Sequence, residues 1–318
     1  MGYLFLGLAL AAGITKGYCG KKTSGAIVSN SDSMIMNVLR MAACIVIGFV
    51  LILMQNNLGS LTPTLPLLLV SALSGIGSAF FVVSWLLSVR SGAYMMVEVF
   101  LLIGVIVPIV PCYFFFGDTV NVWQIIGIII LLVAVFIMCT YNTSIKGKMS
   151  IKALLLLLLC GFSNGITDFS QTLFKKLSTS VEAAEGVEAS EAIIQGATNE
   201  SFQFYTYIFA AITLLITYFI IRQTDKKSGN APRNPIAVIK PIWYYVLIMA
   251  ACLFANSFFK TEAAAYLDPV RLYPLNQGCA VVLSLLMSVF IFKEKINAKC
   301  IVGICLSFVA LLMINLLK

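Results

Sequence analysis

The stretch from Leu65 to Leu87 reads LPLLLVSALSGIGSAFFVVSWLL and contains no charged residue. A helix needs about 20 apolar residues to cross the roughly 30 Å hydrocarbon core of a bilayer. Strands of a membrane barrel would be about ten residues long and would alternate apolar with polar positions, so this stretch predicts a helix. The pattern recurs, and we predict ten transmembrane helices: Gly2–Tyr18, Ser33–Met54, Leu65–Leu87, Ala93–Phe116, Val120–Tyr141, Ile151–Leu173, Ser201–Ile221, Ile242–Tyr266, Leu272–Phe292 and Cys300–Leu317.

The composition of the whole chain agrees with an all-α membrane protein. Of 318 residues, 60% are hydrophobic and 11% are charged, whereas a soluble domain carries roughly 25% charged residues. The net charge of +8 comes from Lys and Arg in short gaps between apolar runs, so we predict no nucleic-acid partner. We expect a multi-pass protein of a cell membrane, the bacterial plasma membrane, in contact with lipid. Both a monomer and a homodimer stay open.

Several kinds of chemistry have no support in the sequence. The chain has no His, which excludes His proton relays and Ser-His-Asp catalysis. Its nine Cys lie in or beside apolar runs and form no C-x-x-C pair, so we predict neither disulfides nor a metal site. No GxxxxGK[ST] motif for ATP binding occurs. The sequence therefore predicts a protein that is not an enzyme and holds no cofactor.

The chain looks duplicated. Residues 8–16 read LALAAGITK and residues 160–168 read CGFSNGITD, so both segments contain Gly-Ile-Thr followed by a charge. Asp118 precedes Gly127 by the same interval that separates Glu294 from Gly303. We predict one five-helix repeat at residues 1–142 and a second at 143–318, the latter with an acidic loop at 175–200. Because five is odd, the two repeats must insert with opposite topology, a common plan of transporters that places the site between the repeats.

Ten spans, the five-plus-five repeat and the acid-to-glycine spacing resemble the drug/metabolite transporter superfamily, specifically its EamA-like ten-helix members. Leu39-Arg40-Met41 is similar to a Leu-Arg-Phe of that family. The stretch from Tyr266 to Leu317 is similar to the end of the four-helix small multidrug resistance proteins. The resemblance implies a small-molecule transporter. Aligned through residues 172–175, the essential first-span Glu of those small proteins falls near Thr167–Asp168, displaced by one residue.

Polar side chains that recur at helical spacing mark one candidate site. Asn164, Asp168 and Gln171 share one face of an otherwise apolar helix, with Thr167 beside them. A charged side chain within a span costs about 2.5–3.5 kcal/mol on insertion scales, so it usually faces the bundle interior. We predict that these four residues bind the substrate, with Asp168 also taking part in coupling or gating. A purely structural stripe between helices is the alternative.

Three further regions join this candidate site. Tyr273, Asn276 and Gln277 lie near the start of the ninth span, where Pro274 frees a backbone carbonyl, and we predict that they also bind substrate. Lys16 holds the repeat-equivalent place of Asp168, and we expect the two to form an ion pair that opens when substrate or a proton intervenes. Glu98, about six residues into the fourth span, is a second candidate for coupling or gating.

These features favour a secondary transporter that moves a small polar or amphipathic metabolite by alternating access, with proton coupling as one option. A lipid-linked or nucleotide-sugar carrier and a cationic drug exporter are the alternatives within the same fold. An intramembrane enzyme would need a catalytic set of side chains that the spans lack. A passive sensor or scaffold would leave the polar stripe and the repeat unexplained.

The distribution of Lys and Arg predicts the orientation. Most of them lie in the odd-numbered gaps between spans, whereas the termini and even-numbered gaps hold only Lys175, Lys176, Lys318 and, directly before the ninth span, Arg271. The positive-inside rule then places the odd-numbered gaps in the cytoplasm and both termini outside. The resemblance implies the opposite, because EamA-like proteins usually keep both termini in the cytoplasm.

Overall fold

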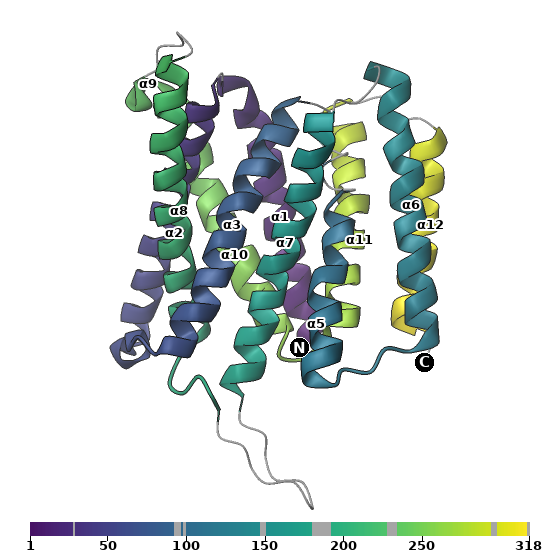
Figure 1. Cartoon of the computed structure of the whole chain (residues 1–318), viewed down its shortest axis with the longest axis horizontal. Coiled ribbons are helices and arrows are strands. Elements are labelled where there is room, and N and C mark those ends of the chain that lie inside the picture. Colours follow the sequence, from purple (N-terminus) through teal and green to yellow (C-terminus); the bar gives the residue numbers. More distant parts are fainter. Residues whose placement is uncertain are drawn as a thin grey trace, which may run out of the picture.

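The computed structural model describes residues 1–27, 29–91, 97, 100–146, 151–179, 192–227, 234–293 and 298–316. Within this part of the chain every regular element is a helix, and the long helices lie roughly side by side (Figure 1). In hydrocarbon, a helix satisfies its own backbone hydrogen bonds, which no open strand can do. The prediction of an all-helical membrane protein is therefore confirmed.

The elements follow one another in two groups separated by residues 147–150. The first group comprises α1 (Gly2–Thr23), η1 (Ser24–Ala26), α2 (Asn30–Met54), η2 (Leu58–Leu61), α3 (Leu65–Ser91), η3 (Leu102–Val105), α5 (Ile106–Phe116) and α6 (Val122–Lys146). The second comprises α7 (Ile151–Ser178), α8 (Asn199–Lys227), α9 (Pro235–Ile239), α10 (Trp243–Ala263), α11 (Pro269–Phe290) and α12 (Ala298–Leu316).

Among the described residues, 6 helices are long and apolar enough to cross a membrane. They cover Gly2–Thr23, Asn30–Met54, Leu65–Ser88, Ala153–Ser178, Asn199–Gln223 and Trp243–Ala263. Shorter apolar helices cover Leu102–Phe116, Val122–Ala134 and Ile301–Ile314. Large apolar side chains such as Phe114, Phe136 and Phe290 are more than two-thirds exposed on the outer surface. Such a surface suits lipid and would be a liability in water.

Two predicted segments differ from the structure. The span predicted at Ser201–Ile221 is longer in the structure, because α8 continues to Lys227, and the short helix α9 follows with Asn234 as its N-cap. The span predicted at Ala93–Phe116 is not one regular α-helix in its described part, where the 3-10 turn η3 precedes α5. Pro108 explains this change, because it has no N–H to donate to the carbonyl of Gly104 four residues earlier.

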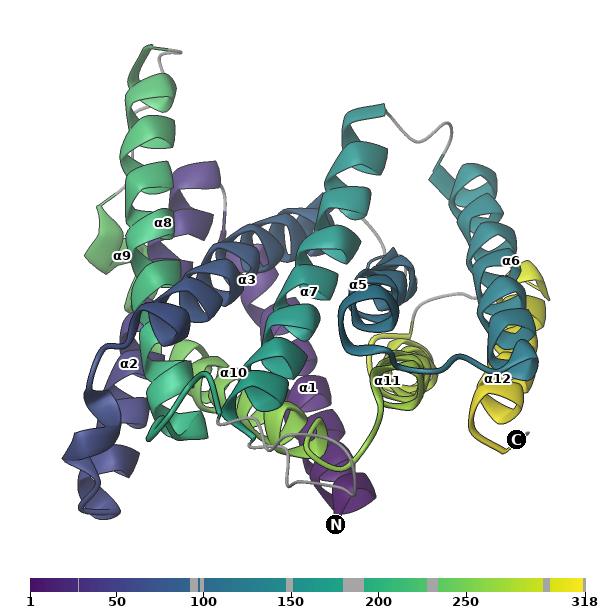
Figure 2. The same cartoon turned by 60° about the horizontal axis from the view of Figure 1, so that its bottom comes forward.

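The strongest packing joins helices from the two groups. α1 packs on α10, α3 on α7, α2 on α8 and α6 on α12. Both views show α6 and α12 side by side at one edge of the bundle, with α5 and α11 between them and the remaining helices (Figures 1 and 2). The candidate site is therefore formed where helices from different halves of the sequence meet.

Three glycines bring α7 close to the segment around η3. A Cβ on Gly161 or Gly165 would collide with the backbone carbonyl oxygens of Phe100 and Gly104, respectively. A Cβ on Gly165 would also lie 2.6 Å from Cβ of Val107. Small residues let membrane helices approach this closely and pack backbone on backbone. The contact holds α7, and the polar stripe that it carries, against the first half of the chain.

Candidate functional site

A cavity of about 50 Å³ lies between α1, α3, α7, α10 and α11. Its polar lining comes from both halves of the chain, and its aromatic lining from α3. The lining side chains used below are Lys16, Phe81, Trp85, Asn164, Asn256, Lys260, Asn276, Gln277 and Ser284. A concave site with a few converging polar groups on an apolar wall is the usual form of a small-molecule site.

Asp168 lies on α7 directly behind the cavity and is fully buried. Its Oδ1 accepts a short hydrogen bond from Nζ of Lys260 on α10, and the two form a buried ion pair. Its Oδ2 accepts a hydrogen bond of 3.2 Å from Nδ2 of Asn164, one helical turn away on α7. A buried carboxylate with both oxygens partnered in this way is fixed in position, and losing either partner would leave a costly charge in the membrane interior.

Tyr273 on α11 hydrogen-bonds to the turn of α7 that carries Asp168. Its hydroxyl donates to the backbone carbonyl of Asp168 at 2.6 Å and lies 2.6 Å from Oγ1 of Thr172. The carbonyls of helix residues normally accept from the residue four positions later, so this hydroxyl adds a second donor to one of them. Tyr273 is fully buried and therefore anchors α11 to α7 rather than facing the cavity.

The predicted ion pair between Lys16 and Asp168 is not the one that forms. Asp168 pairs with Lys260 instead, because the polar face of α7 meets α10 there, where Gln171 also bonds Ser257. Lys16 lines the cavity, with its Nζ 5.3 Å from the centre of the Phe81 ring. The repeat-equivalent charges of the two halves therefore have different surroundings.

The other predicted site residues divide into two sets. Asn164, Asn276 and Gln277 line the cavity together with Lys16. Thr167 and Gln171 are buried in the wall: Thr167 bonds the carbonyl of Ser163 at 3.1 Å, and Gln171 donates to Ser257 on α10 at 2.9 Å. Glu98 lies outside the described residues.

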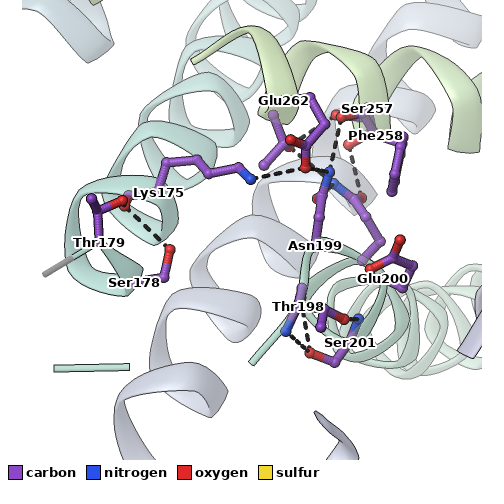
Figure 3. A network of polar contacts seen from close by, with 12 residues as sticks. Lys175, Ser178, Thr179, Thr198, Asn199, Glu200, Ser201, Ser257, Phe258 and Glu262 are labelled. Atoms are coloured by element: carbon purple, nitrogen blue, oxygen red, sulfur yellow. Dashed lines mark hydrogen bonds and ion pairs between the residues drawn. The ribbon is translucent and has the colours of Figure 1, made fainter. Parts of the chain in front are cut away.

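From Gln171 the polar contacts continue to the ends of α7, α8 and α10. Ser257 donates to Oε1 of Gln203 at 2.9 Å, and Nε2 of Gln203 donates to Thr261 at 3.1 Å. We call this series of polar contacts, from Gln171 to Glu262, the seam. Figure 3 shows its last part, where Asn199 donates to Oε1 of Glu262 at 2.7 Å. The seam ties α8 and α10 together on the side of the bundle that holds both marked chain ends in Figure 1.

An ion pair closes this seam. Nζ of Lys175 at the end of α7 lies 2.8 Å from Oε1 of Glu262 on α10 (Figure 3). Below it, Lys176 pairs with Asp118 at 2.5 Å. Asn121, not Asp118, caps the start of α6, and its side chain accepts from the backbone of Trp123 at 3.4 Å. The repeat-equivalent Glu294 lies outside the described residues.

Sequence reasoning assigned no role to three of the lining residues. Lys260 lies within the predicted span Ile242–Tyr266, and the cost of a charge in a span is the signal that could have placed it in the interior. Asn256 is a single amide in the apolar helix α10, where its Nδ2 donates to the carbonyl of Ala9 at 2.7 Å. Trp85 carried no signal, because an aromatic residue in a span more often faces lipid or core.

The apolar helices and the cavity together define a multi-pass membrane protein with a polar interior. Residues 177–316 match the model of the EamA-like transporter family, consistent with the predicted resemblance to the drug/metabolite transporter superfamily. A solved crystal structure matches over 99% of this chain and 96% of its own, with a TM-score of 0.66 and 12% sequence identity. At that identity the likeness shows the fold alone. No curated protein matches the chain. The family match points to a membrane transporter of small substrates.

Proposed function

We propose that this protein is a secondary transporter that moves a small polar or amphipathic metabolite by alternating access. The observation that carries the proposal is that buried polar contacts close the cavity on the side of Asp168 and Lys260. The polar lining is continuous with the buried pair of Asp168 and Lys260, and the seam to Glu262 seals the side beyond it. Opening that side requires a small set of identifiable contacts to break. With no ATP-binding motif in the sequence, a solute or ion gradient drives net movement.

The packing of the helices supports a bundle of ten spans in two inverted five-helix repeats. Exchanging α1 with α7, α3 with α10 and α5 with α11 turns the contact of α1 and α10 into that of α7 and α3. The same exchange turns the contact of α1 and α11 into that of α7 and α5, and leaves the pairs α2–α8 and α6–α12 unchanged. In Figure 1, α1 starts at the edge where α7 ends, as an in-plane twofold axis requires.

The arrangement supports a defined resting conformation. The lining runs from Lys260 along α11 to Ser284 and along α3 to Trp85, away from the seam. Alternating access by movement of one repeat against the other would open the seam and close this opposite side. Lys175, Glu262 and Asn199 lie at helix ends and would separate first.

Counterflow into proteoliposomes tests the proposal. Purified full-length protein is reconstituted, loaded with a panel of unlabelled small metabolites including nucleotide sugars, and challenged with the same labelled solutes. We expect saturable exchange of at least one solute, and an imposed proton gradient tests proton coupling. Cross-linking Lys175 to Glu262 through cysteines should block exchange reversibly. Exchange that survives the cross-link would refute the gating role of the seam.

We also propose that the side of the bundle with both chain ends faces outside. The basic residues Lys21 and Lys22 lie in the last turn of α1, on the opposite side of the bundle (Figure 1). The short helix α9 lies on that side as well (Figure 1). The positive-inside rule places that side in the cytoplasm. A reporter fused after Lys318 should then be active only outside the cell. A cytoplasmic signal from that reporter would reverse the orientation.

A further inference from the structure

We infer that the cavity selects a small organic anion that carries a hydroxyl or N–H donor close to its charged group. This inference rests on the proposed transport function and names the substrate class of the same site. Three features of the lining carry it: the sign of its charges, the exchangeable partner of Lys260, and an amide oxygen that finds no hydrogen-bond partner in the part of the chain that the structure describes.

The charges that a solute would meet are positive. Among the described lining residues, the titratable side chains are Lys16 and Lys260. The carboxylate of Asp168 is 0% exposed and lies behind Lys260 rather than in the lining. A cationic solute would meet like charge before it could reach the carboxylate. An anion meets the ammonium of Lys260 directly.

An anion can also exchange with Asp168 as the partner of Lys260. The buried pair is stable because each charge compensates the other. A carboxylate or similar group arriving from the cavity can accept from Nζ of Lys260 while Asp168 keeps the hydrogen bond from Asn164. One charge-assisted hydrogen bond of Lys260 then replaces another, so Lys260 stays compensated, and the cost of the exchange falls on Asp168, which loses its countercharge. A neutral solute offers Lys260 no such compensation.

The donor requirement comes from Asn276. The side chain of Asn276 lines the cavity, and its Oδ1 is buried without a hydrogen-bond partner among the described residues. An unsatisfied buried acceptor is costly, so a ligand that donates to it gains the difference. Trp85 and Phe81 form an apolar wall of the same cavity and can cover the hydrocarbon part of the solute. The matching solute is therefore anionic and amphipathic, with a donor near the charge.

Four related compounds test these features on the wild-type protein. They are 3-phenyllactate, which has both carboxylate and hydroxyl; 3-phenylpropionate, which lacks the hydroxyl; 3-phenylpropane-1,2-diol, which lacks the charge; and 2-phenylethylamine, a cation. Binding is measured by quenching of Trp85 in a variant whose other tryptophans, Trp123 and Trp243, are changed to Phe. We expect 3-phenyllactate to bind roughly tenfold tighter than 3-phenylpropionate, and the diol and the amine more weakly still.

Two variants then separate the charge assignments. Asp168→Asn removes the competitor for Lys260, so 3-phenyllactate should bind roughly tenfold tighter, whereas a cation that used Asp168 would lose binding. Asn276→Leu should erase the preference for 3-phenyllactate over 3-phenylpropionate. If Asp168→Asn fails to fold, the ranking on the wild-type protein and Asn276→Leu still decide.

The outcomes distinguish this inference from the proposed function. Binding and counterflow of the amine or the diol in preference to the anions would overturn the substrate class and leave the transporter proposal intact. Anions that bind but show no counterflow would support the site and overturn the transporter proposal. Absence of binding by all four compounds would overturn the inference.

Discussion

The Gly-Ile-Thr-charge motif occurs twice, at Gly13–Lys16 in α1 and at Gly165–Asp168 in α7, and its two copies have different surroundings. Lys16 is half-buried and lines the cavity, whereas Asp168 is fully buried and paired with Lys260. A Cβ on Gly13 would meet only the amide of Asn256, at 3.1 Å, but one on Gly165 would meet backbone. The two copies therefore have similar local sequence but different surroundings, which the helix lying opposite each copy sets.

The second copy of the motif, in α7, is held by more contacts than the first copy, in α1. α7 is held by glycine contacts near η3, by the hydroxyl of Tyr273 and by the pair with Lys260. In α1, Gly13 of the motif contacts α10 only through the side-chain amide of Asn256, and Lys16 extends into the cavity lining. Matched substitutions at equivalent positions of α1 and α7 test this difference.

The largest expected effect is at the charge. Asp168→Asn should abolish counterflow and lower stability by about 3–5 kcal/mol, because it leaves Lys260 buried without its countercharge. Adding Lys260→Met should recover most of that stability, since no uncompensated charge remains, without recovering transport. Melting temperature in detergent and counterflow are measured on the single and double variants. Transport restored by the double variant would reduce the pair to a structural role.

The next effect is at the glycine. Gly165→Ala forces the carbonyl of Gly104 and the side chain of Val107 to move, and we expect a loss of about 1–3 kcal/mol as for other overpacked interiors. Gly13→Ala is the matched control and should cost well under half as much, because the end of the Asn256 side chain can shift. Thermal unfolding of both variants in the same detergent measures this difference. Equal losses would contradict the comparison.

A smaller effect is expected at the charge of the first copy. Lys16→Gln removes one cation from the cavity lining but leaves the pair of Asp168 and Lys260 in place. We expect apparent substrate affinity to fall while the protein keeps its stability, because a half-buried side chain was never fully desolvated. Concentration-dependent counterflow reports the affinity. A loss of maximal rate at unchanged affinity would instead assign Lys16 to gating.

The smallest effect is expected at the threonines. The hydroxyls of Thr15 and Thr167 both bond the carbonyl four residues earlier, at 2.9 Å and 3.1 Å. Thr15 is exposed, whereas Thr167 is buried and lies 3.5 Å from the hydroxyl of Ser78. Thr167→Val should therefore cost about 0.5–1.5 kcal/mol, and Thr15→Val almost nothing. Equal melting temperatures of the two variants would show that the buried hydroxyl of Thr167 contributes no more to stability than the exposed hydroxyl of Thr15.

The sequence predicted the elements better than their partners. Uncharged runs such as Leu65–Leu87 predict membrane helices because the bilayer imposes both length and composition. Helical spacing also indicated that Asn164, Asp168 and Gln171 share a face. It could not show which helix lies opposite that face, and so the partner of Asp168 was wrongly taken to be Lys16. Contacts between α7 and α10 join residues about ninety positions apart, a distance over which no local pattern carries information.

The same limit applied at the cavity. Asn164, Asn276 and Gln277 were predicted because amides are conspicuous in apolar spans, and the structure places them in one lining. Tyr273 has the same helical spacing, but its hydroxyl reaches the backbone of α7 and leaves it in the wall. Whether a polar side chain faces a void or a neighbouring helix depends on packing, which periodicity alone does not specify.

The interleaved packing of the two halves has a consequence for how the protein is made. α6 packs chiefly on α12, and α1, α2 and α3 pack chiefly on helices of the second half. During synthesis the first half therefore sits in the bilayer with its main interfaces facing lipid until the ribosome has delivered their partners. α1 waits longest, because it is made first and its main partner α10 begins only at Trp243.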